Sequence, residues 1–183
     1  MANTSPANEK QSAIVLRDVR KHYGAVHAVD GVDLKIPQGQ VFGLIGHNGA
    51  GKSTLFKMML GLERPTSGHI TVAGADVAGP NFRAARRKLG YLPENVVLYD
   101  NLSGLETLNF FARLKGASLQ ECPSLLDKVG LSHAGKRAVR EYSKGMRQRL
   151  GFAQALLGKP EVLFLDEPTN GLDPQAIRDF YFT

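Results

Sequence analysis

The sequence predicts an α/β fold with a mixed, mostly parallel core sheet. Candidate strands alternate with candidate helices along the chain, which is typical of strand–helix–strand units. Two candidate strands, Val41–Ile45 and Val162–Leu165, are short, continuous apolar runs, as expected of strands buried on both faces. The first runs into a glycine-rich loop and the second ends in two acidic residues. These observations predict both the fold class and the place of a candidate site.

The composition fits one domain, or most of one. The chain has 183 residues, of which 43% are hydrophobic and 22% charged, so it can bury a core and is not disordered as a whole. The single cysteine, Cys122, excludes an internal disulfide and a multi-cysteine metal site, and it favours a reducing compartment. No apolar run approaches the roughly 20 residues that span a bilayer, and the polar N-terminus shows no signal peptide.

The net charge of +6 is compatible with nucleotides, nucleic acid or anionic lipid as partners, and does not decide among them. Residues 1–12, small and polar, are expected to form a flexible tail. Residues 13–183 are expected to form the folded domain.

The elements of the first half follow from alternation, β-branched residues and turn signals. The expected strands are 13–19, 26–36, 41–45 and 69–73, and a helix is expected over 52–60. The second half is more helical, and a helical subdomain is expected at about 95–158. Expected helices there are 83–88, 105–114, 123–129 and 144–157, expected strands are 89–92 and 162–165, and a last helix starts at Pro174.

Residues Gly46–Ser53 match the phosphate-loop pattern G-x-x-x-x-G-K-[ST] between a strand and a helix. Glycines let successive backbone N–H groups point at an anion, and the helix N-terminus adds partial positive charge. Lys52 is expected to reach the β- and γ-phosphates, and the Ser53 hydroxyl to ligate Mg²⁺. A plain glycine-rich strand–helix turn is the alternative. The residues expected to bind the nucleotide are Gly46, His47, Asn48, Gly49, Ala50, Gly51, Lys52, Ser53 and Thr54.

Asp166 and Glu167 end the apolar strand 162–165. Carboxylates at the carboxyl edge of a sheet lie where a phosphate loop also lies. Asp166 is then expected to hold Mg²⁺, and Glu167 to orient and polarise the attacking water. The alternative is two surface acids at a strand end.

Further segments resemble a known family. Tyr142–Arg149 resembles the signature segment, usually LSGGQ, of ABC-type ATPases, and Gly171–Pro174 looks like the D-loop of that family. Tyr23 looks like the aromatic residue that stacks on adenine, and Glu94 stands in the place of the Q-loop glutamine. The resemblance implies a P-loop NTPase fold of the ABC ATPase type, with an N-terminal antiparallel β subdomain and a helical subdomain.

The resemblance also implies cofactors and partners. ATP and Mg²⁺ would be bound, with Glu94 contributing to both sites. Ser143 and Gly145 would act on the ATP held by the opposite subunit of a head-to-tail homodimer, although Ser143 could instead be a plain helix N-cap. A separate transmembrane permease would be the partner, and nucleic acid would not. The location would be cytoplasmic and peripheral, on the cytoplasmic face of the inner membrane.

Departures from the family pattern point to a subgroup. The chain looks like the subgroup that serves ABC-2-type export permeases, because it carries Lys144, Met146 and Glu94 in place of the usual residues. The stretches 90–117 and 142–157 look closer still to the ATPase subunit of the transporter that matures the copper sites of nitrous-oxide reductase. No copper-ligand constellation is visible in the chain.

None of the five histidines lies beyond His133, whereas the family continues to a histidine that contacts the γ-phosphate. The chain is therefore expected to be truncated at its C-terminus, with weak or absent ATPase activity. Three alternatives stay open: a non-catalytic nucleotide-binding fragment, an ABC-2 exporter ATPase for another substrate, and a soluble ABC protein acting on nucleic acid.

Overall fold

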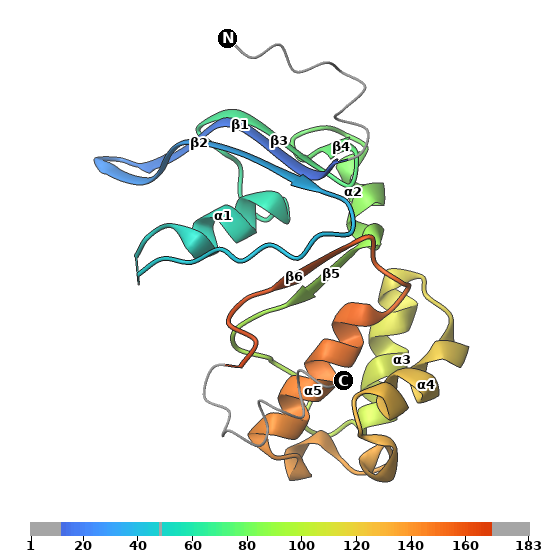
Figure 1. Cartoon of the computed structure of the whole chain (residues 1–183). Helices are drawn as coiled ribbons and strands as arrows, with labels where there is room; N and C mark the ends of the chain where they lie inside the picture. The colour runs from blue at the N-terminus through green and yellow to red at the C-terminus, as the bar shows by residue number, and fades with distance from the viewer. Residues whose placement is uncertain (1–11, 48, 170–183) are drawn as a thin grey trace. The chain divides into compact units, whose positions relative to one another are not determined.

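The computed structural model describes residues 12–47 and 49–169. The chain divides into two compact units, residues 1–89 and 90–183. Each unit has its own sheet, and they differ in character: the first is built mainly on strands and the second mainly on helices (Figure 1). Among the helices of the described residues, none is long and apolar enough to cross a lipid bilayer.

The N-terminal unit is built on an antiparallel four-stranded sheet with the strand order β2-β1-β3-β4. The strands are β1 (Ser12–Tyr23), β2 (Val26–Pro37), β3 (Ser67–Val72) and β4 (Ala75–Asp76). β1 and β2 form a long hairpin in which Leu16 lies opposite Leu34 and His22 lies opposite His27. The antiparallel N-terminal β subdomain implied by the family resemblance is present.

Helix α1 (Lys52–Met59) supplies the other layer of the N-terminal core (Figure 1). Its apolar side chains recur at helical spacing, so Leu55, Met58 and Met59 share one buried face. The sheet contributes alternate residues from β1 and β3, which include Leu16 and Ile70. The short helix α2 (Phe82–Ala85) follows β4, and a 3₁₀ turn at Arg86–Lys88 leads out of it.

The C-terminal unit pairs β5 (Leu89–Leu92) with β6 (Val162–Leu165) and packs three helices around one apolar cluster. The helices are α3 (Gly104–Lys115), α4 (Cys122–Lys128) and α5 (Lys144–Leu156). Leu108, Leu131 and Leu150 are fully buried in this cluster. The helices fall inside the range 95–158 that was predicted as a helical subdomain.

Caps and buried hydrogen bonds define the helix ends of the C-terminal unit. Ser103 and Glu106 form a reciprocal capping box at the start of α3, and Gly116 ends that helix in the left-handed conformation. The hydroxyl of buried Tyr142 donates to the carbonyl of Ala134 at 2.7 Å. A polar group inside an apolar cluster needs such a partner, so this bond fixes the chain just before α5.

Most predicted elements are confirmed, several with shifted ends. The strands 89–92 and 162–165 have the predicted bounds, and helices α1, α3, α4 and α5 agree to within one residue at each end. The predicted helix 83–88 is split into α2 and a 3₁₀ turn, and β4 was not predicted. Ser12, assigned to the tail, is the buried first residue of β1. The helix predicted from Pro174 lies outside the described residues.

The prediction of a buried strand at Val41–Ile45 is wrong. These residues have no strand conformation, and the side chains of Val41 and Ile45 are 103% and 94% exposed. Apolar residues form a strand only when their N–H and C=O groups join a ladder. Within residues 12–47 and 49–169, no strand pairs with this segment. The predicted burial of β6 is also only partly correct, because Phe164 is buried while Leu163 is 36% exposed.

Candidate functional site

The loop Gly46–Gly51 leads directly into α1, and its backbone needs glycine. Gly49 and Gly51 have φ angles of 85° and 81°, in the left-handed region that glycine adopts freely. A Cβ atom added to Gly51 would lie 2.2 Å from the carbonyl oxygen of Ala28 in β2. The loop therefore lies directly against the sheet at Gly51, and no larger residue fits there. Asn48 lies outside the described residues.

Lys52, the first residue of α1, crosses this loop. Its ammonium donates to the carbonyl oxygens of Gly46 at 2.6 Å and His47 at 3.1 Å. Gly51 at the N-cap offers no side-chain acceptor to the first turn of α1. Since the first N–H groups of a helix have no acceptor within the helix, this turn can donate to an anion.

The adjoining hydroxyl, Ser53, is exposed. A hydroxyl oxygen beside a phosphate-binding turn is a ligand that Mg²⁺ accepts. The residues of the loop thus fit both a nucleotide phosphate and its Mg²⁺.

Tyr23 stands at the end of β1 and is 46% exposed. Its hydroxyl donates to Glu63, and the Lys21 ammonium lies 4.9 Å from its ring centre. The hydrogen bond with Glu63 raises the pKa of Tyr23, helped by partial burial and the charge of Glu63, while a hydrogen bond with Thr54 acts the other way. The structure therefore brings the predicted adenine-stacking residue into contact with α1, next to the predicted phosphate-binding residues.

The second group of predicted site residues lies at one end of the β5–β6 pair. The backbone N–H of Asp166 donates to the carbonyl of Leu92 at 2.9 Å, so the end of β6 lies beside the end of β5. Glu94 follows Leu92 by two residues and is exposed. This pairing brings the two predicted Mg²⁺ carboxylates to the same end of the strand pair. The pKa of Tyr91 is raised, mainly by burial and also by the negative charge of Asp166.

Glu167 departs from ordinary backbone geometry. Its φ angle is 45°, in the left-handed region where a residue with a Cβ is strained. Its side chain is exposed. Glu167 directly follows Asp166, the predicted Mg²⁺ ligand at the end of β6. Backbone strain of this kind is common at functional positions.

Ser143 is the N-cap of α5. A plain N-cap was the alternative to the predicted phosphate contact of Ser143. Its hydroxyl oxygen accepts from the N–H of Met146 at 3.2 Å, and its side chain is exposed. Gly145 is the second residue of α5 and is half-buried. From the same helix, the side chain of buried Gln148 donates to the carbonyl of Pro168 at 2.9 Å. The start of α5 is thereby linked to the segment that follows Glu167. The D-loop candidate Gly171–Pro174 lies outside the described residues.

Among residues 12–47 and 49–169, sequence reasoning missed a cluster of ligand-type side chains, His22, His27 and Asp30. The hairpin pairing places His22 directly opposite His27. The signal that could have revealed it is the spacing H-x₄-H around Gly24 between two predicted strands, because a short hairpin brings such positions face to face.

The chain is similar to known proteins over most of its length. Residues 29–170 match the family model described as ABC transporter. A lantibiotic transport ATP-binding protein of Streptococcus pyogenes is 42% identical, over 90% of this chain and 70% of that protein. A daunorubicin resistance ATP-binding protein of Streptomyces coeruleorubidus is 42% identical over 90% of this chain. A bacitracin transport ATP-binding protein of Bacillus licheniformis is 42% identical over 88% of this chain. The chain spans 53% of the length of each of the latter two relatives.

Solved structures agree with these likenesses. An ATP-binding subunit of an ABC transporter superposes with a TM-score of 0.79 at 35% identity, over 91% of this chain and 71% of that one. A protein from Clostridium perfringens, described as part of an ABC transporter complex, superposes with a TM-score of 0.81 at 27% identity, over 93% of this chain and 71% of that one.

Proposed function

This chain belongs to the ABC transporter family of ATP-binding proteins, and from that premise we propose that it binds Mg-ATP and hydrolyses it to drive a separate membrane permease. The family match and the solved relatives confirm the predicted fold class, a P-loop NTPase fold of the ABC ATPase type. The activity, the partner and the roles of individual residues are proposals.

The phosphate loop carries the proposal. Gly51 is held against the backbone of β2, Lys52 crosses the loop, and the first turn of α1 has N–H groups to donate. We assign the β- and γ-phosphates to this loop and to Lys52. The adenine would stack on Tyr23, whose hydroxyl is held by Glu63 and whose ring is half-exposed. An aromatic face fixed in this way offers stacking area at little entropic cost.

The hydrolytic step is a water attack on the γ-phosphorus. Glu167 would accept a proton from the water as the new P–O bond forms, and the bond from phosphorus to the ADP oxygen breaks. Ser53, Asp166 and Glu94 would hold Mg²⁺, which neutralises charge on the phosphate oxygens when bound. Lys52 would stabilise the charge that develops on the same oxygens.

The signature helix is assigned to the partner subunit's nucleotide. The N-terminus of α5 carries partial positive charge, and the Ser143 hydroxyl can donate to a phosphate oxygen while its lone pair accepts from Met146. Gly145 leaves room for close approach of a phosphate. Ser143 and Gly145 would thus complete a site across a head-to-tail homodimer, with the permease bound on the cytoplasmic face of the membrane.

The names of the relatives support an export function. They concern daunorubicin resistance, lantibiotic transport and bacitracin transport. We therefore propose a drug or a peptide antibiotic as the substrate class, exported by an ABC-2-type permease. The finer prediction, copper-site maturation for nitrous-oxide reductase, has no support from these relatives.

One observation favours a second candidate, a chain that binds nucleotide without turnover. The segment 41–45, which precedes the phosphate loop, is exposed and is not paired as a strand within residues 12–47 and 49–169. A loop without a paired strand on one side is less firmly positioned, which affects transition-state alignment more than ground-state binding.

Nucleotide binding and phosphate release, measured separately on the same preparations, test both candidates. Glu167→Gln should lower kcat by about 10²–10⁴-fold with an ATP affinity within about threefold of the native chain. Lys52→Ala should weaken ATP binding itself. Glu161→Gln, an exposed acid just before β6, is the matched control and should change neither. Binding without any phosphate release from the native chain would favour the non-catalytic candidate, and no ATP binding would refute both.

A further inference from the structure

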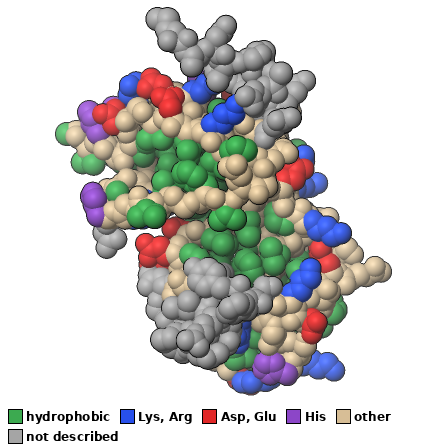
Figure 2. Space-filling view, in the orientation of Figure 1, with side chains coloured by type: hydrophobic (Ala, Val, Ile, Leu, Met, Phe, Trp, Pro, Cys, Tyr) green, Lys and Arg blue, Asp and Glu red, His purple; other side chains and the backbone are tan. Residues whose placement is uncertain are grey.

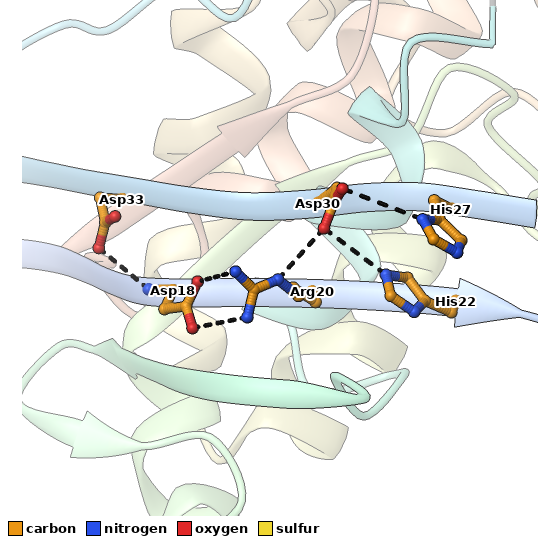
Figure 3. A network of polar contacts seen from close by, with 6 residues as sticks. All are labelled: Asp18, Arg20, His22, His27, Asp30 and Asp33. Atoms are coloured by element: carbon orange, nitrogen blue, oxygen red, sulfur yellow. Dashed lines mark hydrogen bonds and ion pairs between the residues drawn. The ribbon is translucent and has the colours of Figure 1, made fainter.

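The end of the β1–β2 hairpin gathers three metal-ligand side chains that the ATPase proposal does not use. His22 lies in β1, and His27 and Asp30 lie in β2 (Figure 3). Histidine and acidic side chains also come together at the surface over this hairpin (Figure 2). One potential ligand atom from each of the three lies within 4.8 Å of the others.

Asp30 lies between the two histidines and Arg20. One carboxylate oxygen of Asp30 is 3.7 Å from Nε2 of His22, and the other is 3.9 Å from Nδ1 of His27. Both distances are too long for hydrogen bonds. Nε2 of His22 is buried, and no atom of the described residues forms a hydrogen bond with it. A buried polar atom of this kind is costly unless a partner satisfies it, and a bound ion would supply that partner.

We propose that His22, His27 and Asp30 bind one divalent transition-metal ion, for which Zn²⁺ is the best representative. Two imidazole nitrogens and one carboxylate oxygen form a ligand set that suits Zn²⁺ and similar ions. Mg²⁺ prefers oxygen ligands and retains its waters, so this site differs in chemistry from the Mg-ATP site. Three protein ligands leave a fourth position for water.

A neighbouring ion pair orients the carboxylate of Asp30. Arg20 forms an ion pair with both carboxylate oxygens of Asp18 and donates through Nε to one oxygen of Asp30 at 3.1 Å. The second oxygen of Asp30 stays available to the ion. Arg20 is thus a positioning residue that orients the ligand carboxylate.

Metal binding requires one local movement. The two imidazole rings are stacked, with centroids 3.8 Å apart and planes 8° from parallel. Parallel rings direct their lone pairs side by side, whereas ligand nitrogens must converge on an ion at about 2.0–2.1 Å. The rings must therefore tilt apart. The side chains of His27 and Asp30 are 56% and 59% exposed, so they can rotate without disturbing a core.

Isothermal titration of the untagged full chain with Zn²⁺, without nucleotide, tests the site. The native chain should bind one ion with micromolar affinity. His27→Ala and Asp30→Asn should each weaken binding at least about tenfold. His69→Ala is the matched control, because His69 is exposed in the same unit and stands apart from the cluster, and it should bind as the native chain does. Far-UV circular dichroism verifies that the variants are folded.

Two-dimensional NMR of the imidazole nitrogens gives a second readout. Zn²⁺ should shift the ring signals of His22 and His27 and leave that of His69 in place. A millimolar excess of Mg²⁺ should not displace the ion. The proposal is refuted if the native chain does not bind Zn²⁺, if the double variant His22→Ala/His27→Ala binds as tightly as the native chain, or if Mg²⁺ competes.

Discussion

The phosphate loop of the N-terminal unit and the acid-bearing strand end of the C-terminal unit are shaped by different forces. Backbone geometry shapes the loop: Gly51 has a left-handed conformation and lies against the carbonyl of Ala28. Side-chain packing shapes the second region, because α5 rests on the buried cluster through Leu150 and reaches Pro168 through Gln148.

The two regions should therefore respond to different substitutions. A single methyl group added at Gly51 can disrupt the loop, because the loop backbone lies directly against the backbone of β2 there. The stability of the second region should change little when its exposed residues are substituted. It should fall when a substitution leaves a cavity in the buried cluster beneath them.

The largest expected effect is on the C-terminal cluster. Leu150→Ala should lower the free energy of unfolding of this unit by about 3 kcal/mol, because it removes a fully buried side chain and leaves a cavity. Hydrogen exchange measured by mass spectrometry should show faster exchange in α3–α5 and little change in the β1–β2 hairpin. Leu114→Ala, at a position 67% exposed on α3, should cost less than about 0.5 kcal/mol. Equal loss of protection in both units would contradict the comparison.

Gly51→Ala should produce the next largest effect, and in the other unit. The added Cβ would clash with the carbonyl of Ala28, and the left-handed backbone adds strain. We expect a loss of about 2 kcal/mol in local stability and ATP binding weakened at least about tenfold. Gly39→Ala separates the two causes, because Gly39 has a φ of 73° but no atom of the part of the chain that the structure describes lies within 4 Å of the added Cβ. If both variants bind ATP equally well, the close contact with β2 is not what shapes the loop.

The two helix N-caps of the C-terminal unit should separate stability from activity. Ser103→Ala removes a capping box and should cost about 1 kcal/mol, with ATP turnover per folded molecule unchanged. Ser143→Ala removes one hydrogen bond of 3.2 Å and should cost about 0.5 kcal/mol, yet strongly reduce turnover. Urea titration and phosphate release measure the two quantities. If Ser143→Ala leaves ATP turnover unchanged, Ser143 acts only as a helix cap.

The smallest expected effect is on the pH dependence of stability. One carboxylate in each unit should contribute to it. Glu63 and Glu106 have pKa values lowered from 4.5, chiefly by hydrogen bonds from Tyr23 and Ser103 respectively. A carboxylate with a lowered pKa stabilises the fold above its unfolded-state pKa, and the contribution is lost as pH falls through the folded-state pKa. Glu63→Gln and Glu106→Gln should therefore have a Tm slightly below that of the native chain at neutral pH. The gap should close below pH 4.5.

Solvent screens both carboxylates, so the shifts in Tm should be small. A gap that widens as pH falls would reverse the sign of the proposed linkage. A gap for one variant alone would show that the two hydrogen bonds are not equivalent.

Local signals in the sequence predicted much of the candidate site. The glycines, Lys52 and Ser53 act through their own backbone and the first turn of one helix, so their arrangement depends on residues close in sequence. The bounds of β5 and β6 and the acids that end β6 were also predicted, because an apolar run and the acids that follow it form one local pattern, but the pairing of the two strands was not. The roles of Glu94, Tyr23 and Ser143 rested on the family resemblance and stay predictions.

The failure at Val41–Ile45 has a physical cause. An apolar run reports the tendency of its side chains to leave water, whereas strand formation also needs a neighbouring ladder. That neighbour is a property of the whole fold. The same reason explains why the cluster of His22, His27 and Asp30 was missed, since it depends on the register of a hairpin and not on any single strand.

By itself, the sequence determined the ends of α1, α3, α4 and α5 to within one residue, the glycine requirement of the phosphate loop and the acids at the end of β6. These features depend on capping, backbone φ angles and short-range periodicity, which act over a few residues. Only the tertiary structure decided which strands pair, that Tyr23 contacts α1, and that two histidines face each other across a hairpin. The first two outcomes depend on contacts between residues far apart in the chain, and the third depends on the register of the hairpin, which packing sets.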